Sequence, residues 1–228
     1  MANDAEKEAA ARSSLRFVHD GDILGLGTGS TATYFVRVLG ERVRAGLKIR
    51  GIPTGAQTKD LAVSLGIPLT TLDEFQQIDV TIDGADEIDP ELRLIKGGGG
   101  ALLREKIVAS ASRKYVIIAD SSKQVKVLGK FPLPVEVIPF AQALIAKKIA
   151  ALGASVHLRM NSSGQPFVTD EGHHILDCNF GQISNPMSLA QELERMPGVV
   201  EHGLFIGMAD VVLIGKGKDV LELQRAKN

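Results

Sequence analysis

The fold is decided by a short apolar run that ends in a glycine-rich turn, Asp22-Ile23-Leu24-Gly25-Leu26-Gly27-Thr28-Gly29-Ser30-Thr31. The run as far as Leu26 predicts a buried strand, and residues 32–43 predict the helix that follows the turn. A strand, a glycine-rich turn and a helix form a typical anion site, because the free N–H groups and the dipole of the helix both favour negative charge at its start. The sequence therefore predicts an α/β fold with a phosphate-binding turn at residues 28–31.

This turn differs from the fingerprint of dinucleotide-binding proteins. Ser30 stands in place of the third glycine of G-x-G-x-x-G. Residues 47–52 also lack the acidic residue that the fingerprint requires about 20 positions further on. The hydroxyl groups of Thr28, Ser30 and Thr31 suit a single phosphate instead. The alternative is a purely structural turn between strand and helix.

Four further polar turns each follow a predicted strand. They are Thr54–Thr58 after 47–52, Asp83–Asp86 after 78–82, Lys96–Gly100 after 92–95 and Asp120–Lys123 after 115–119. The almost unbroken apolar character of 78–82 is typical of a parallel sheet that is covered on both faces. Because ligands bind at the carboxyl ends of the strands in such sheets, we expect all five turns to face one crevice.

The pattern of predicted strands and helices changes at residue 132, which indicates a second domain. We expect a smaller α+β domain at 132–206, serving as a lid or as an oligomerisation surface, and a larger α/β domain formed by 1–131 and 207–228. The order β-α-β-β-α-β, which is the ferredoxin-like motif, supports the smaller domain. Its predicted elements are strands at 135–138, 155–160, 166–178 and 199–205 and helices at 140–152 and 188–196.

Several other elements of the larger domain are predicted from the same patterns. The strand at 211–214 is expected to rejoin the first sheet. The remaining predictions are a helix at 4–19, a helix after Thr58 that runs to Leu65, a short strand at 67–70 and a last helical turn or two at 220–224.

The turn at Lys96–Gly100 is a second predicted anion site, because it joins a cation and four glycines to the start of a helix. Glu105 lies early in that helix, and its neighbours three and four positions away are the apolar residues Ala101, Leu102, Val108 and Ala109. A carboxylate held against apolar groups has a raised proton affinity, which suits a general base or acid. The alternative is a solvated surface glutamate behind an ordinary glycine-rich turn.

Composition excludes several classes of function. The 228 residues include 26 Lys and Arg against 27 Asp and Glu, and a net charge of −1 argues against nucleic acid or an anionic membrane as the main partner. The single cysteine, Cys178, forms no internal disulfide and indicates a reducing, cytoplasmic compartment. The first eleven residues lack the apolar core of a signal peptide, and no run is long enough for a membrane span. His173 and His174 match no metal-ligand signature, so we expect no metal site.

Five stretches carry a combined motif. They are Gly25–Thr31, Asp83–Ile88, Lys96–Gly99 with Arg104–Lys106, Asp120–Lys123 and Gly129–Pro139. In this order and spacing, over nearly the whole chain, they resemble the A-type ribose-5-phosphate isomerases. The resemblance implies a Rossmann-like, mostly parallel sheet with helices on both faces and a smaller α+β domain. It also implies a cytoplasmic homodimer or homotetramer of the non-oxidative pentose phosphate pathway, which interconverts D-ribose 5-phosphate and D-ribulose 5-phosphate without cofactor or metal.

The same resemblance implies roles for individual residues. Glu105 is the general base, which moves a proton between C2 and C1 of the open-chain sugar through an enediol(ate). Lys96 and the backbone of Gly97, Gly98 and Gly99 stabilise the oxyanion. Asp83 and Asp86 serve ring opening and proton transfer between O1 and O2. The other implied substrate-binding residues are Thr28, Gly29, Ser30, Thr31, Gly84, Ala85 and Lys123, with Lys7 approaching the phosphate.

One departure from the family and three other functions stay open. Gly100 stands where alanine is common, which we expect to loosen the helix start by up to about 1 kcal/mol. A sugar-phosphate sensor or carrier needs the phosphate turn but has no use for Glu105 as a base. A nicotinamide-dependent oxidoreductase is disfavoured by the missing third glycine and acidic residue. The sequence poorly distinguishes a ribose-5-phosphate isomerase from an isomerase of another aldose phosphate, such as arabinose or allose 5- or 6-phosphate.

Overall fold

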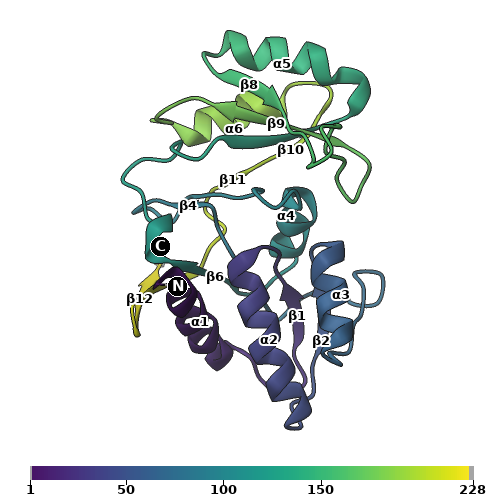
Figure 1. Cartoon of the computed structure of the whole chain (residues 1–228), viewed down its shortest axis with the longest axis vertical. Helices are drawn as coiled ribbons and strands as arrows, with labels where there is room; N and C mark the ends of the chain where they lie inside the picture. The colour runs from purple at the N-terminus through teal and green to yellow at the C-terminus, as the bar shows by residue number, and fades with distance from the viewer. Residues whose placement is uncertain (1, 226–228) are drawn as a thin grey trace. The chain divides into compact units, whose positions relative to one another are not determined.

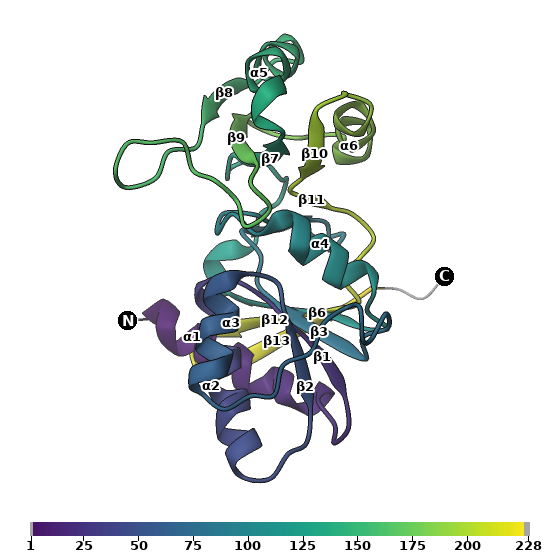
Figure 2. The same ribbon diagram turned by 90° about the vertical axis from the view of Figure 1, so that its right-hand side faces the viewer.

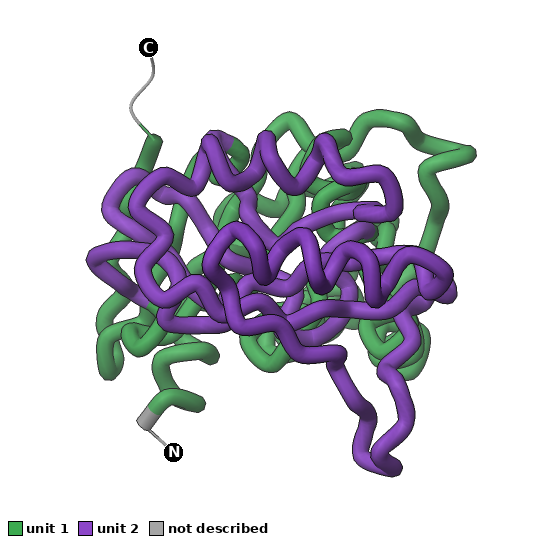
Figure 3. The backbone as a smooth tube through the Cα atoms, turned by 90° about the horizontal axis from the view of Figure 1, so that it is seen from above, with its two compact units in different colours: residues 1–85, 104–123, 208–228 green, residues 86–103, 124–207 purple. Residues whose placement is uncertain are grey.

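The computed structural model describes residues 2–225 and divides into two compact units. Unit 1 consists of residues 1–85, 104–123 and 208–228, and unit 2 consists of residues 86–103 and 124–207 (Figure 3). The domain boundaries expected above stay a prediction. Among the described residues, no helix combines the length and the apolar character that crossing a membrane requires.

Unit 1 is built on a six-stranded sheet in the order β13-β12-β6-β3-β1-β2 (Figure 1). Every neighbouring pair is parallel except β12 with β13. Its elements are α1 (Ala2–Ser14), η1 (Leu15–Phe17), β1 (Ile23–Leu26), α2 (Ser30–Arg44), β2 (Arg50–Pro53), α3 (Ala56–Ser64), β3 (Val80–Asp83), α4 (Leu102–Ser110, shared with unit 2), β6 (Tyr115–Asp120), η2 (Ser121–Lys123), β12 (Val211–Lys216) and β13 (Asp219–Gln224).

Helices cover both faces of this sheet (Figures 1 and 2). On one face, α1, α2 and α3 bury a core that includes Leu24 and Leu26 of β1. On the other face, Val108 of α4 packs with Ile23 and Ile78. Gly25 permits this close packing, because a Cβ atom there would lie 2.6 Å from Cγ1 of Val108. The predicted α/β class, with a mostly parallel sheet and helices on both faces, is confirmed.

Unit 2 contains a four-stranded sheet in the order β10-β7-β9-β8, in which all pairs are antiparallel. Helices α5 and α6 contribute Ile145 and Leu193 to its core. A separate three-stranded antiparallel sheet has the order β11-β5-β4. The elements are β4 (Glu87–Ile88), β5 (Leu94–Ile95), β7 (Leu133–Val137), η3 (Pro139–Ala141), α5 (Gln142–Ala151), β8 (Ser155–Leu158), β9 (His174–Asn179), α6 (Pro186–Glu194), β10 (Val199–His202) and β11 (Leu204–Phe205).

The structure corrects four predicted elements. Residues 220–224 form strand β13 and not a helix, because a tight turn at Gly217 (φ +62°) folds the chain back antiparallel to β12. Residues 67–70 make one isolated bridge and no strand. Residues 166–173 lie outside β9, and 199–205 splits into β10 and β11.

The expectation that five polar turns end strands of one parallel sheet is also wrong for one of them. Lys96 follows β5, which belongs to the three-stranded antiparallel sheet of unit 2. The other four turns follow β1, β2, β3 and β6 of the parallel sheet. Those four therefore share the carboxyl edge of the sheet in unit 1.

Candidate active site

The candidate residues fall into two groups, one in each unit. Unit 1 holds residues 28–31, Asp83, Gly84, Ala85, Glu105 and Lys123. Unit 2 holds Asp86 and residues 96–99.

Asp83 connects the turns that follow β1 and β3. Its side chain is fully buried, and its Oδ1 accepts hydrogen bonds from the backbone N–H of Thr28 at 3.2 Å and of Gly84 at 2.7 Å. Gly27 lets the two turns approach, since a Cβ atom there would lie 2.1 Å from the same oxygen. The structure therefore brings Thr28, Asp83 and Gly84 together, as the sequence predicts for turns at one sheet edge.

Two buried threonines of the turn after β2 fix the position of Thr28. The Thr28 hydroxyl lies 2.7 Å from the Thr54 hydroxyl and 3.1 Å from the Thr58 hydroxyl. Thr54 donates to the carbonyl of Leu26, and Thr58 donates to the carbonyl of Gly27. These contacts hold Thr28, and with it the turn at residues 28–31, against the turn at residues 54–58.

A small polar hollow of about 220 Å³ opens beside this turn, at the start of α2. Ser30 is exposed at its edge, whereas Thr31 is only 6 % exposed and does not line the hollow. Gly29 precedes the helix with φ +110°, a conformation that glycine adopts without strain. The start of α2 therefore presents Ser30 and free helix N–H groups, and not the Thr31 hydroxyl, to this space. The lining residues are Thr28, Gly29, Ser30, Thr33, Val36, Gln57, Thr58 and Leu61.

Glu105 and Asp83 lie in buried surroundings together with the phenol of Tyr115, which the sequence analysis did not identify. Glu105 on α4 is 4 % exposed, in agreement with its apolar neighbours in the sequence. The hydroxyl of Tyr115 donates to Oδ2 of Asp83 at 3.4 Å. Burial, and then the negative charges of Asp83 and Glu105, raise the pKa of Tyr115 well above its ordinary value. Tyr115 therefore stays protonated as a hydrogen-bond donor beside two carboxylates.

Helix α1 is attached to the turn that contains Lys123 by Glu6. The Glu6 carboxylate accepts hydrogen bonds from the N–H and hydroxyl of Ser121 at 2.9 and 2.7 Å and from the N–H of Gly217 at 3.0 Å. These hydrogen bonds favour the charged form and lower the pKa of Glu6. The contact fixes the helix that carries Lys7 to the turn after β6.

Replacing Glu6 with glutamine is expected to destabilise the protein in a pH-dependent manner. Because the pKa of Glu6 is lower in the folded than in the unfolded chain, its contribution is present at neutral pH. That contribution is lost as the pH falls through the folded-state pKa. Urea unfolding should therefore separate wild type and Glu6→Gln at pH 7 and bring them together at acidic pH. The exposed Asp60→Asn serves as control, and a difference that grows in acid would contradict the assignment.

In unit 2, Asp86 and the glycine turn are joined directly. Oδ2 of Asp86 accepts from the N–H of Gly98 at 2.7 Å, and a Cβ atom on Gly98 would lie 2.6 Å from its other oxygen. Lys96 is 2 % exposed, and its Nζ lies 5.4 Å from the centre of the Phe205 ring. Its backbone N–H donates to the carbonyl of Gly203. A buried lysine thus precedes a turn in which a Cβ atom at position 98 would crowd the Asp86 carboxylate.

Gly100 has a conformational reason in this chain. Its φ is +83°, and a Cβ atom would lie 2.5 Å from Cζ of Phe167. It precedes α4, which begins at Leu102. Glycine therefore suits this turn rather than loosening the helix start, and the expected destabilisation is wrong for this position.

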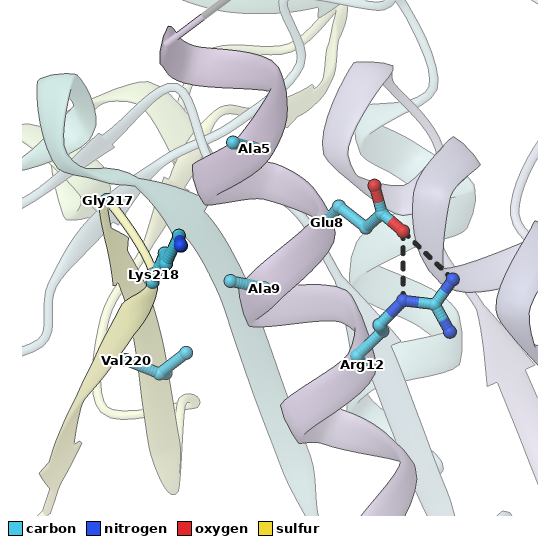
Figure 4. Close-up of a pocket in the computed structure, with 7 residues that line it drawn as sticks. All are labelled: Ala5, Glu8, Ala9, Arg12, Gly217, Lys218 and Val220. Carbon is cyan, nitrogen blue, oxygen red and sulfur yellow. Dashed lines mark hydrogen bonds and ion pairs between the residues drawn. The ribbon is translucent and has the colours of Figure 1, made fainter.

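Other features of the described residues lie apart from these two groups. No group of three or more His, Cys, Asp or Glu side chains in residues 2–225 is arranged to hold a metal ion. Nδ1 of His173 lies 3.0 Å from Glu136. A hollow of about 430 Å³ lies between α1 and the β12–β13 turn, where Arg12 pairs with Glu8 (Figure 4). None of the predicted site residues lines this hollow.

Comparisons with known proteins decide the family. A sequence profile described as ribose 5-phosphate isomerase A (phosphoriboisomerase A) matches residues 50–219. The chain belongs to the ribose-5-phosphate isomerase A family. It is 56 % identical to the ribose-5-phosphate isomerase A of Parvibaculum lavamentivorans, over 97 % of this chain and 100 % of the relative. It is 52 % identical to that of Bradyrhizobium diazoefficiens, over 100 % and 98 %.

Solved structures agree with this assignment. A D-ribose-5-phosphate isomerase in complex with phospho-erythronic acid has a TM-score of 0.96 at 41 % identity, covering 99 % of this isomerase and all of that chain. The ribose 5-phosphate isomerase A of Methanocaldococcus jannaschii has a TM-score of 0.92 at 43 % identity, covering 97 % and 98 %. The family resemblance inferred from the motifs is thereby confirmed, and this chain is an aldose–ketose isomerase.

Proposed function

We propose that the isomerase interconverts D-ribose 5-phosphate and D-ribulose 5-phosphate in the non-oxidative branch of the pentose phosphate pathway. Family membership supports the substrate class. The observation that carries the mechanism is a carboxylate, Glu105, that is 4 % exposed and shares its buried surroundings with Asp83 and Tyr115. A buried carboxylate of this kind suits proton transfer at carbon.

In the proposed reaction, Glu105 takes the proton from C2 of the open-chain aldose, the C–H electrons form the C1–C2 double bond of an enediol(ate), and the electrons of the C1=O π bond move to O1, which takes up a proton. Glu105 then returns its proton to C1, where the electrons of the C1–C2 double bond accept it, while O2 loses its proton and becomes the carbonyl oxygen of the ketose. Lys96 and the amides of the glycine turn stabilise the negative charge on oxygen. Asp83 and Asp86 carry protons between the sugar oxygens and assist ring opening.

Phosphate binding is assigned to the start of α2, with Lys123 and Lys7 as further cations. Gly29, Gly84 and Ala85 complete the proposed substrate contacts. The test of the whole proposal is an assay for ribulose 5-phosphate formed from ribose 5-phosphate. Arabinose and allose phosphates tested alongside separate this reaction from related isomerisations, and an NADH titration tests the oxidoreductase alternative. Binding of ribose 5-phosphate without turnover would favour a sensor.

The Ser30→Ala/Thr31→Ala double variant is expected to raise KM for ribose 5-phosphate with a smaller change in kcat. Since Ser30 is exposed beside the hollow and Thr31 is buried, Ser30→Ala alone should produce most of the increase. Loss of one hydrogen bond to a charged group corresponds to about a 10-fold rise. Steady-state kinetics with the exposed Ser184→Ala as control measures it. A collapse of kcat at constant KM would contradict a simple phosphate site.

Activity is expected to survive exhaustive treatment with EDTA. An ammonium group and backbone amides can stabilise an enediolate, and a carboxylate can carry the proton, so the proposed chemistry needs no metal or cofactor. The measurement is turnover before and after chelation and after adding back Mg²⁺, Mn²⁺ or Zn²⁺. A loss of activity that one of these ions restores would contradict the proposal.

We further propose a cytoplasmic homodimer or homotetramer, as the family resemblance implies. The smaller domain would then serve as an oligomerisation surface, or alternatively as a lid. Light scattering on the full chain distinguishes a dimer from a tetramer.

A further inference from the structure

The peptide that joins Gly97 and Gly98 is held on both sides by charged groups of unit 2. On one side, Nη1 of Arg159 donates to the carbonyl of Gly97 at 2.8 Å. On the other side, the N–H of Gly98 donates to the carboxylate of Asp86 at 2.7 Å. The C=O and N–H of a trans peptide point in opposite directions, so the two contacts together fix the orientation of this peptide plane.

The next peptide has the same orientation. Nη1 of Arg159 also lies 3.2 Å from the carbonyl of Gly98, so the N–H of Gly99 points away from the guanidinium. Among the residues that the structure describes, no group accepts a hydrogen bond from this N–H. The carbonyls of the turn are thus drawn to Arg159, and two consecutive amides point the other way.

Arg159 is itself rigidly placed. It directly follows β8, and its backbone N–H donates to the carbonyl of Ile175 at 2.8 Å. Its Nε and Nη2 form a two-pronged ion pair with Asp177 of β9, and only Nη1 reaches the glycine turn. The Arg159 side chain is 14 % exposed, and its guanidinium lies 6.0 Å from the Phe167 ring. A planar guanidinium can serve a carboxylate and carbonyls at once, which a lysine cannot do.

We propose that the Arg159–Asp177 ion pair is a positioning device for the oxyanion-binding amide of Gly99 in this isomerase. Arg159 acts through the carbonyls of Gly97 and Gly98. Because the N–H of Gly98 donates to Asp86, the amide that Arg159 turns toward the developing oxyanion is that of Gly99. The inference rests on the proposed function, in which the glycine turn stabilises the enediolate. A donor displaced by about 1 Å can cost about 100-fold in rate, so such positioning has a measurable effect.

The test compares Arg159→Met, Arg159→Lys and Asp177→Asn with the wild type. Arg195→Met is the matched control, because Arg195 lies on the same unit and is 76 % exposed. Steady-state kinetics give kcat and KM. Affinities are measured for phospho-erythronic acid, whose carboxylate resembles the enediolate oxygens, and for erythritol 4-phosphate, which carries CH₂OH in its place.

We expect Arg159→Met to lower kcat by about 10- to 100-fold, with KM much less affected. The preference for phospho-erythronic acid over erythritol 4-phosphate should fall with it. Arg159→Lys should recover only part of both quantities, and Arg195→Met should change neither. If Arg159→Met does not fold, the inference is tested with Asp177→Asn, which keeps the side-chain volume. The kcat and the ligand preference of that variant then decide.

Two results would overturn the inference. One is full kcat and unchanged ligand preference in the Arg159 and Asp177 variants. The other is an equal loss of affinity for both ligands together with a lower melting temperature, which indicates a structural role. A wild type without turnover would overturn the proposed function itself, whereas an active wild type with unaffected variants overturns only the role of Arg159.

Discussion

Replacing Glu105 with glutamine is expected to lower kcat for ribose 5-phosphate by about 10²- to 10⁴-fold, while KM changes little. Glutamine keeps the size of the side chain, which is 4 % exposed, but it cannot accept a proton at neutral pH. Exchange of the C2 proton of the substrate in D₂O, followed by NMR, should be lost in parallel. Exchange reports the proton transfer itself, independently of product release.

The control for this substitution is Glu192→Gln, since Glu192 lies on the surface of α6 with 53 % of its side chain exposed. That variant should keep full turnover and full exchange. Equal and large losses of binding and rate in Glu105→Gln would instead indicate a structural role for the carboxylate. Retained proton exchange in Glu105→Gln would assign the base to another residue.

The parts of the fold that sequence predicted well are those in which local pattern and tertiary environment agree. The apolar run of β6 is buried along its whole length and lies inside the parallel sheet. The predicted β-α-β-β-α-β order likewise agrees with the four-stranded antiparallel sheet of unit 2 and its two helices. A fully buried strand has no polar face, which agrees with the unbroken hydrophobic run of this element.

The errors occur where long-range pairing decides the structure. Residues 220–223 of β13 are partly buried, and only the antiparallel register with β12 makes residues 219–224 a strand. The two-residue strand β5 precedes Lys96, and its apolar pair does not reveal which sheet it joins. Short apolar runs are compatible with either secondary structure and with either sheet.

The candidate site shows the same difference between what local sequence indicates and what only the folded chain reveals. The sequence indicated Asp83, Asp86 and Lys96, because charged residues in glycine-containing turns are visible in it. It indicated Glu105, because this residue has apolar neighbours on its predicted helix. The sequence did not indicate Tyr115, which reads as a core residue at the start of a strand, although its hydroxyl contacts Asp83. Supporting residues of this kind come from distant positions in the chain, so their contacts exist only in the folded structure.

Replacing Lys96 with methionine is expected to lower kcat by about 10²- to 10³-fold, the usual loss for a missing oxyanion donor. Methionine keeps an unbranched chain in a position that is 2 % exposed and removes the ammonium group with its charge and its hydrogen-bond donors. The measurement is steady-state kinetics together with affinities for phospho-erythronic acid and erythritol 4-phosphate. The exposed Lys147→Met, on α5 of the same unit, serves as control.

The ligand affinities separate the role of Lys96 from that of Glu105. A base contributes to moving the proton and little to holding the enediolate, so Glu105→Gln should keep most of the preference for phospho-erythronic acid. A cation that stabilises the oxyanion contributes to that preference directly, so Lys96→Met should lose it along with kcat. If both variants lost the preference equally, the division into a base and an oxyanion donor would be wrong. If Lys96→Met lost affinity for both ligands alike, Lys96 would serve general phosphate binding.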